Sequence, residues 1–352
     1  MFLAGLGTAT PAQRYTKADC WEAFKASAWF GRLDRRARAI TELVLARDNG
    51  IEARRLAVDT LQEALVIDPD TLQARFLAHA PALAASAAGR ALADAGCAAD
   101  QIDAVLISTC TGYLCPGLTS YAAQALGLRE DVVALDLVGQ GCGAALPNWR
   151  TAEALLASGR CARVLSVCVE ISSAAMYLDS DPGVLISACL FGDGAGAAVL
   201  CASPPPGKRS VRWRADGSLT DPSRRDALRF EQRNGLLRNI LTREVPGLAA
   251  EYAARVLDGV LAGQGLQASQ IGAWILHAGG RDVLAALRDR LGLSEADQHH
   301  SAAVLREYGN LSSAFVYFVL QAALAQPQPG GLWWMASFGA GFSSHGALLE
   351  VE

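Results

Sequence analysis

The sequence predicts an α/β fold made of two halves with the same layout. Short apolar segments rich in β-branched residues alternate with helical segments along most of the chain. This alternation is typical of a sheet that helices cover on both faces. Three prolines and a glycine at 202–210 interrupt the pattern. The layout then recurs: Val105 and Ile275 are 170 residues apart, and Cys142 and Asn310 are 168 apart. An internal duplication accounts for both intervals.

The first half is expected to begin with helices and continue with strands. Residues 17–65 are rich in Ala, Leu, Arg and Glu at helical spacing, and 71–97 predict one long helix with many small residues. Apolar segments with the composition of strands follow at 104–109, 132–138, 163–171 and 196–202, with helical segments at 119–128 and 148–159.

The second half resumes after the break with the same kinds of element. Its expected strands are 211–215, 273–280 and the segments within 332–351, and its expected helices are 245–263, 281–293 and 312–325. Pro246 lies near the start of the first of these helices, where proline is tolerated. We therefore divide the chain into residues 1–205 and 206–352.

Composition excludes several classes of protein. The chain has 352 residues, 51% of them hydrophobic, which is enough to form a large core. Its net charge is −4 with no block of one sign, so a nucleic-acid partner is not expected. The first residues lack the pattern of a secretory leader and no apolar run is long enough to span a membrane, so we expect a cytoplasmic protein. The nine cysteines show no zinc spacing, and neither a metal site nor a disulfide framework is expected.

Cys142 is the cysteine whose surroundings predict chemistry. It lies in GQGCGAA, where an apolar strand ends, three glycines surround the cysteine and a helix begins. Glycines allow a sharp turn and close approach to a ligand. The unpaired N–H groups and the dipole of a helix start favour a thiolate and can stabilise an oxyanion. Cys142 is therefore a candidate nucleophile, the alternative being a buried cysteine in a tight turn.

His277 and Asn310 are the candidate partners of this cysteine. His277 ends an apolar strand in WILHAGG, and strand ends are where α/β folds place their sites. Asn310 lies in YGNLSSA at a helix start, where it could equally serve as a plain N-cap. Because the repeat places Cys142 and Asn310 at equivalent helix starts, we expect all three side chains to converge as nucleophile, base and polar partner.

These motifs and several others occur in an order that resembles the type III polyketide synthases, the chalcone synthase family. The matching segments are TCTGYLCPGLTSYAAQALGLR, GQGCGAA, RVLSVCVEISS, LFGDGAGAAVL, LTREVPGL, LHAGG, YGNLSSA and SFGAGF. The resemblance runs from about residue 100 to the end, and NGIEARRLAV before it is also similar. It implies a thiolase-like αβαβα fold whose two halves are related by a pseudo-twofold axis.

The resemblance also implies a reaction and roles for the three residues. Cys142 would take an acyl starter from coenzyme A as a thioester, and His277 would act as its base. His277 and Asn310 would hold the carbonyl of malonyl-CoA, stabilising the enolate formed by decarboxylation. The resulting carbanion would attack the acyl group in a Claisen condensation that uses coenzyme A thioesters as substrates and needs no metal or other cofactor. The resemblance further implies a homodimer.

The resemblance places six further residues near the substrate. Phe191 matches a gatekeeper between tunnel and cavity, although it could be a core aromatic. Cys115 matches a loop residue that reaches into the partner's cavity. Ser312 and Ala340 are expected in the substrate pocket, Ala340 standing where the family has proline. Arg54 and Arg55 fall near the family's basic tunnel mouth, although basic residues are commonly just solvated.

The product and two other interpretations are left open. A second gatekeeper phenylalanine is not evident, because RNGLLRNILTREVP carries polar residues near that place. Starter, chain length and cyclisation are therefore not implied. A stand-alone ketosynthase of the ketoacyl synthase III type would use the same fold and triad, and either substrate could then arrive on an acyl carrier protein. An inactive partner subunit of another synthase is a third interpretation.

Overall fold

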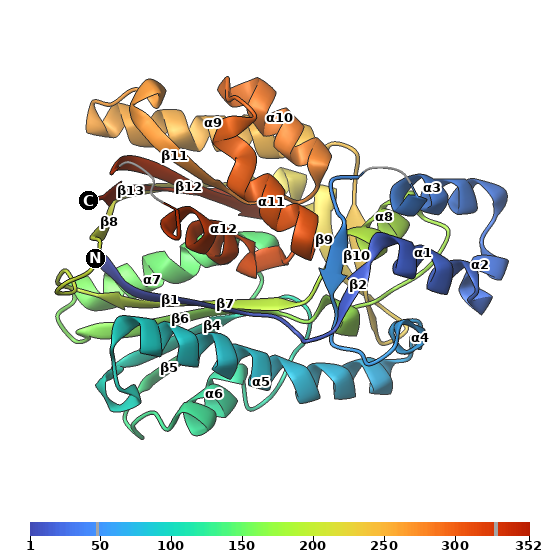
Figure 1. The fold of residues 1–352 in the computed structure, drawn as a ribbon, viewed down its shortest axis with the longest axis horizontal. Helices are drawn as coiled ribbons and strands as arrows, with labels where there is room; N and C mark the ends of the chain where they lie inside the picture. Colours follow the sequence, from blue (N-terminus) through green and yellow to red (C-terminus); the bar gives the residue numbers. More distant parts are fainter. Residues whose placement is uncertain (47–48, 327–329) are drawn as a thin grey trace.

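The computed structural model describes residues 1–46, 49–326 and 330–352 and confirms the layered α/β architecture. Figure 1 shows five layers: helices α9 and α10, one half of the sheet, helices α7 and α12 at the centre, the other half of the sheet, and helices α5 and α6. Within the described residues, nine strands form one mixed sheet in the order β11-β12-β13-β8-β1-β7-β6-β4-β5. The two halves of the sheet meet at β1 and β8, where Phe2 pairs with Arg212.

The elements divide between the halves as the repeat predicts. The first half of the sheet contains β1 (Phe2–Ala9), β4 (Ala104–Ser108), β5 (Val133–Leu137), β6 (Arg163–Glu170) and β7 (Gly194–Cys201). The second contains β8 (Val211–Thr220), β11 (Ile271–Leu276), β12 (Gly331–Gly339) and β13 (Ser343–Val351). The layer helices are α5 (Pro69–Ala95), α6 (Leu118–Leu126), α7 (Ala145–Ala157), α9 (Val245–Gln264), α10 (Arg281–Leu291) and α12 (Phe315–Leu324).

A smaller group of elements lies beside one end of the layers (Figure 1). It contains the helices α1 (Lys17–Lys25), α2 (Ala28–Arg32), α3 (Arg35–Ala46), α4 (Leu61–Ala64) and α8 (Pro182–Leu190). Two antiparallel pairs of strands belong to it. Strand β2 (Arg14–Thr16) pairs with β3 (Ala53–Arg55), which follows α3 in the sequence, and β9 (Leu228–Arg233) forms a hairpin with β10 (Leu236–Leu241). Helix α11 (His299–Tyr308) leads from the second half into this region.

The central helices form the core that joins the halves. Trp149 of α7 and Phe315 and Tyr317 of α12 are almost completely buried between the two halves of the sheet. Trp149 Nε1 donates a hydrogen bond to the Tyr317 hydroxyl over 3.0 Å. Pro147 lies in the first turn of α7, where its missing N–H removes no bond within the helix. The starts of α7 and α12 are thereby fixed against each other.

Three sequence expectations need correction. Strand β1 was not expected, because FLAGLGTA is rich in alanine and glycine; its glycines let α5 approach, since a Cβ on Gly7 would lie 2.3 Å from the Ala87 carbonyl oxygen. The β9–β10 pair was not expected either. Strand β5 is not covered on both faces: it is an edge strand, and Val133 and Leu135 are exposed.

No helix of the described residues is long and apolar enough to cross a membrane.

Candidate active site

The turn that carries Cys142 depends on close backbone packing between the halves. Cys142 is the middle residue of a short 3₁₀ turn, Gly141–Gly143, that leads into α7. Gly141 has a φ of 54°, in the left-handed region. A Cβ on Gly339, at the end of β12, would lie 2.4 Å from the Gln140 carbonyl oxygen and 2.5 Å from the Gly143 nitrogen. The second half of the chain therefore holds the cysteine turn in place through a glycine contact.

His277 follows strand β11 directly and is held by backbone and ring contacts. Its N–H donates to the Ala336 carbonyl over 2.9 Å, which extends the pairing of β11 with β12. Its ring packs edge-on against Phe315 and Phe338, with centroid distances of 5.3 and 4.9 Å. His277 is buried, and its Nδ1 has no hydrogen-bond partner among the described residues.

Asn310 is fixed by a bridge to the first half. Its N–H donates to the Leu190 carbonyl over 2.9 Å, and its own carbonyl accepts from Gly192 N–H over 3.0 Å. Its side-chain Oδ1 accepts from Ser312 N–H over 2.8 Å, and Nδ2 donates to the Gly279 carbonyl over 3.2 Å. One hydrogen of Nδ2 is left for a ligand.

The three candidate residues line one pocket, as the sequence predicts. Cys142, His277 and Asn310 share it with Phe191 and Phe338, and its outer part is lined by Ile40, Leu43 and Val44 of α3 and by Arg243 and Arg281. A thiol, an imidazole and a carboxamide thus line a common space, as the expected roles of the three residues require.

Ser312 contacts the nucleophile directly. Its Oγ donates to Cys142 Sγ over 3.2 Å and also lies 3.3 Å from Glu170 Oε1 and 3.4 Å from Cys110 Sγ. Ser312 has a φ of 51°, a left-handed conformation that is uncommon for a residue with a Cβ. The sequence analysis placed Ser312 in the substrate pocket; in the structure Ser312 does not line the pocket but is bonded to the Cys142 sulfur.

Glu170 is a residue that sequence reasoning missed. It is completely buried at the end of β6 and accepts hydrogen bonds from Cys110 N–H, Thr111 Oγ1 and Ser313 Oγ. Burial raises the pKa of its carboxyl group. The signal was present, because a lone carboxylate in an apolar strand, RVLSVCVEI, must have buried partners.

The protonation states differ from the sequence expectation. Burial raises the pKa of the Cys142 thiol to about 12, and the bond from Ser312 offsets only part of this effect. Burial also lowers the pKa of His277 to about 3. The helix start was expected to favour a thiolate, but the loss of hydration outweighs it. In the ligand-free chain both groups are therefore neutral, and the thiol proton must move as the sulfur reacts.

Of the remaining predicted residues, Phe191 reaches the pocket and the others do not line it. Phe191 lines this pocket and a second cavity behind it. Ala340 packs against Gly141, behind the cysteine turn. Cys115 is exposed on the loop before α6. It does not line the Cys142 pocket of its own chain.

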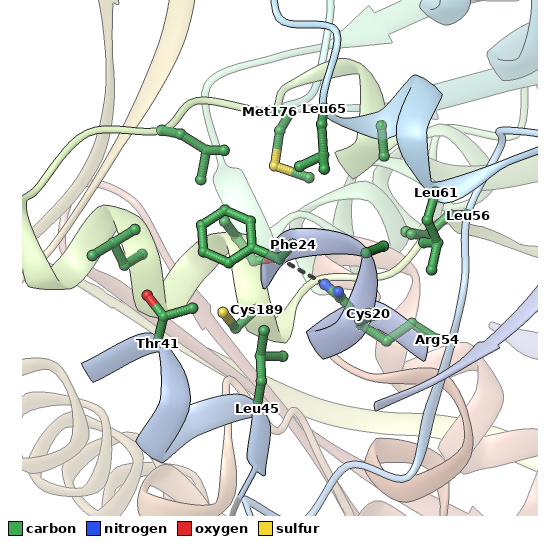
Figure 2. Close-up of a pocket in the computed structure, with 15 residues that line it drawn as sticks. Cys20, Phe24, Thr41, Leu45, Arg54, Leu56, Leu61, Leu65, Met176 and Cys189 are labelled. Carbon is green, nitrogen blue, oxygen red and sulfur yellow. Dashed lines mark hydrogen bonds between the residues drawn. The ribbon is translucent and has the colours of Figure 1, made fainter. Parts of the chain in front are cut away.

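Arg54 and Arg55 lie away from the pocket that holds Cys142. Figure 2 shows Arg54 inside a separate, mostly apolar pocket with Phe24 and Leu56. Its buried guanidinium donates to the carbonyls of Ala188 (2.7 Å) and Phe191 (3.1 Å). Arg55 is turned the other way and forms an ion pair of 3.4 Å with Glu307. The arginines that do line the Cys142 pocket are Arg243 and Arg281.

The five-layered fold, with Cys142 in the turn before one central helix and Asn310 five residues before the other, is that of the thiolase-fold condensing enzymes. Residues 56–204 match the family model for the N-terminal domain of chalcone and stilbene synthases, and residues 223–331 match the model for their C-terminal domain. The chain belongs to this family, the type III polyketide synthases.

Individual relatives cover the chain almost completely. It is 32% identical to 1,3,6,8-tetrahydroxynaphthalene synthase of Streptomyces peucetius subsp. caesius, over 99% of this chain and 92% of the relative. It is 28% identical to 3,5-dihydroxyphenylacetyl-CoA synthase of Streptomyces toyocaensis, over 99% and 89%. The crystal structure of PKS-I from the brown alga Ectocarpus siliculosus superposes with a TM-score of 0.91 at 26% identity, over 99% and 98% of the two chains. The chain is thus an acyltransferase that forms polyketides by condensing coenzyme A thioesters, and the family requires no other cofactor.

Proposed function

We propose that Cys142 carries the acyl chain during this synthesis. His277 and Asn310 then serve two half-reactions at one site: transfer of the starter to Cys142, and condensation of that acyl group with malonyl-CoA. The observation that carries the proposal is the convergence of the three side chains on a single pocket, with Ser312 bonded to the cysteine sulfur. The family matches favour this interpretation over a stand-alone ketosynthase.

In the first half-reaction, Cys142 Sγ attacks the carbonyl carbon of an acyl-CoA starter. The thiol proton passes to the imidazole of His277, which lines the same pocket and is neutral before the reaction. The bond from the carbonyl carbon to the coenzyme A sulfur breaks, and that sulfur leaves with the proton from His277. The acyl group is then held as a thioester on Cys142.

In the second half-reaction, malonyl-CoA takes the place of coenzyme A. Cleavage of its carboxylate bond releases CO₂ and leaves an enolate, whose oxygen accepts hydrogen bonds from neutral His277 and from Asn310 Nδ2. The enolate carbon attacks the acyl carbonyl, and Cys142 leaves as the chain passes to coenzyme A. The exclusion of water from this buried site strengthens both hydrogen bonds to the enolate.

Intact-protein mass spectrometry tests this proposal. The protein is incubated with a panel of acyl-CoAs and then with malonyl-CoA, beside Cys142→Ala. We expect an acyl adduct on the native chain, absent from the variant, that disappears into a released polyketide when malonyl-CoA is added. An adduct formed from acylated carrier protein and not from coenzyme A thioesters would identify a carrier-dependent enzyme. Product formation by Cys142→Ala would refute the role of the cysteine and favour an inactive-subunit interpretation.

We also propose that the chain forms a homodimer through the exposed edge around β5. Tyr113 and Val138 are 72% and 61% exposed, and Val133 and Leu135 of the edge strand are exposed as well. Exposed apolar side chains grouped on an edge strand are typical of an interface. Cys115 lies on the same loop as Tyr113, which supports the proposal that this loop reaches the partner.

Two further expectations stay predictions. The division at residues 1–205 and 206–352 is supported by the connection between β7 and β8, which carries the chain from one half of the sheet to the other. A cytoplasmic location is consistent with substrates that are coenzyme A thioesters.

A further inference from the structure

A second cavity lies behind Phe191 and carries polar as well as apolar groups. Phe191 lines both this cavity and the pocket of Cys142. Leu56, Met176 and Phe230 supply apolar walls, whereas Asn239 supplies a carboxamide. Phe191 therefore lies between the Cys142 pocket and a space of mixed polarity.

Asn239 is the unusual group in this cavity. It lies on β10, paired across the hairpin with Phe230, and is 9% exposed. Its Oδ1 is buried and has no hydrogen-bond partner among the described residues. A buried acceptor without a donor destabilises the free protein, so such groups are uncommon unless a ligand completes them.

The three serine side chains of the cavity already have partners, and Thr111 Oγ1 donates to Glu170; the Tyr177 hydroxyl is the other polar group of the lining. The hydroxyl of Ser172 donates to the Gly192 carbonyl, that of Ser173 to Asp193, and that of Ser187 to the Gly183 carbonyl. These bonds leave Asn239 with an unsatisfied acceptor facing apolar neighbours such as Phe230. A ligand that brings a hydroxyl group would satisfy it.

We propose that Asn239 is a specificity-determining residue whose Oδ1 accepts a hydrogen bond from a hydroxyl group of the acyl chain held on Cys142. The hydroxyl belongs either to a hydroxylated starter or to an enol of the growing chain. A chain without a hydroxyl at this place leaves Oδ1 unpaired and is selected against, because sites built for a hydrogen bond discriminate strongly against analogues that lack it. This inference rests on the proposed function.

The test uses Asn239→Leu, which keeps the side-chain volume and removes the acceptor. Two pairs of starters differ by one hydroxyl: hexanoyl-CoA with 6-hydroxyhexanoyl-CoA, and phenylacetyl-CoA with 4-hydroxyphenylacetyl-CoA. For each pair, kcat/KM is measured with malonyl-CoA, and product lengths are determined for the hydroxyl-free starters. Gln232→Leu is the matched control, since it removes an exposed carboxamide from the neighbouring strand β9.

If the starter supplies the hydroxyl, Asn239→Leu lowers the preference for the hydroxylated member of at least one pair by about tenfold. If the growing chain supplies it, the preference is unchanged and the variant releases shorter products from the hydroxyl-free starters. Gln232→Leu is expected to change neither quantity by more than about twofold. Unchanged preference and unchanged product length in Asn239→Leu would overturn the inference.

Thermal unfolding separates a ligand contact from a structural one. Removal of an unpaired acceptor should leave the Tm of the free protein unchanged or raise it. A lower Tm, with equal loss of activity on both members of each pair, would show a structural role and also overturn the inference. Failure of the proposed function looks different: no starter would then form an adduct on Cys142 of the native chain.

Discussion

Ser312 Oγ donates a hydrogen bond to Cys142 Sγ over 3.2 Å, although the two residues are 170 positions apart in the sequence. The bond joins the start of one central helix to the residues before the other, and so couples the two halves of the fold at the reacting atom. It also lowers the pKa of a thiol that burial otherwise raises. Ser312 is therefore a positioning residue for the nucleophile.

Ser312→Ala is expected to make Cys142 a weaker nucleophile. Loss of the hydrogen bond raises the pKa of the thiol further, so alkylation of Cys142 by iodoacetamide at pH 8 to 9 should slow several-fold. The kcat/KM for acyl transfer from the starter should fall by about tenfold. Ser344→Ala is the control, because the buried Ser344 Oγ has no partner among the described residues. Alkylation of Ser312→Ala as fast as the native chain would contradict this prediction.

His277 is expected to make the protein sensitive to acid. Its pKa is lowered to about 3 by burial, whereas the ordinary value is 6.5, so the unfolded chain binds its proton first as the pH falls. The stabilising contribution is present above pH 6.5 and is lost by about 1.4 kcal/mol per pH unit below it. Replacement of His277 by Gln should therefore reduce the loss of stability between pH 6.5 and 4.5, measured by urea unfolding. His79→Gln, at an exposed position, should unfold with the native pH dependence.

The glycine contact at the cysteine turn gives a third prediction. Gly339→Ala places a Cβ against the Gln140 carbonyl and the Gly143 nitrogen, so the turn that presents Cys142 must shift. Activity is expected to fall by a factor of a hundred or more, because small displacements of a nucleophile have large effects. Gly259→Ala in helix α9 meets no atom within 4 Å and should be neutral or stabilising by about 0.5–1 kcal/mol. Equal kcat/KM for both variants would show that the turn tolerates the shift.

The sequence identifies this site well where a local pattern carries the information. Cys142 lies in the turn before α7 and His277 directly after β11, as their local motifs indicate, whereas Asn310 lies five residues before α12. Glu170 was not singled out, and Asn239 lies in RNGLLRNILTREVP, a segment noted only for its lack of a gatekeeper phenylalanine. Their importance depends on which donors surround them after the halves pack, and no spacing in the chain specifies those neighbours.

Arg54 shows the opposite error, in which a residue type suggested a role that its position does not support. The pair Arg54–Arg55 was interpreted as a basic tunnel mouth. Both residues lie on β3, which pairs with β2, and successive side chains of a strand point to opposite faces. Arg54 therefore points into the protein and Arg55 toward Glu307. A three-residue strand is too short to show this alternation in the sequence.

The exposed edge around β5 gives the final prediction. If the homodimer forms there, Val138→Lys should place a charge in an apolar interface and shift the protein to monomers, measured by light scattering coupled to size exclusion. Val66→Lys is the matched control, since Val66 is an exposed apolar residue on a different surface. Because the loop of Cys115 borders this edge, the monomer should also lose part of its kcat/KM while still forming the acyl adduct on Cys142. A Val138→Lys variant that stays dimeric would place the interface elsewhere, and a native monomer with full activity would refute the homodimer itself.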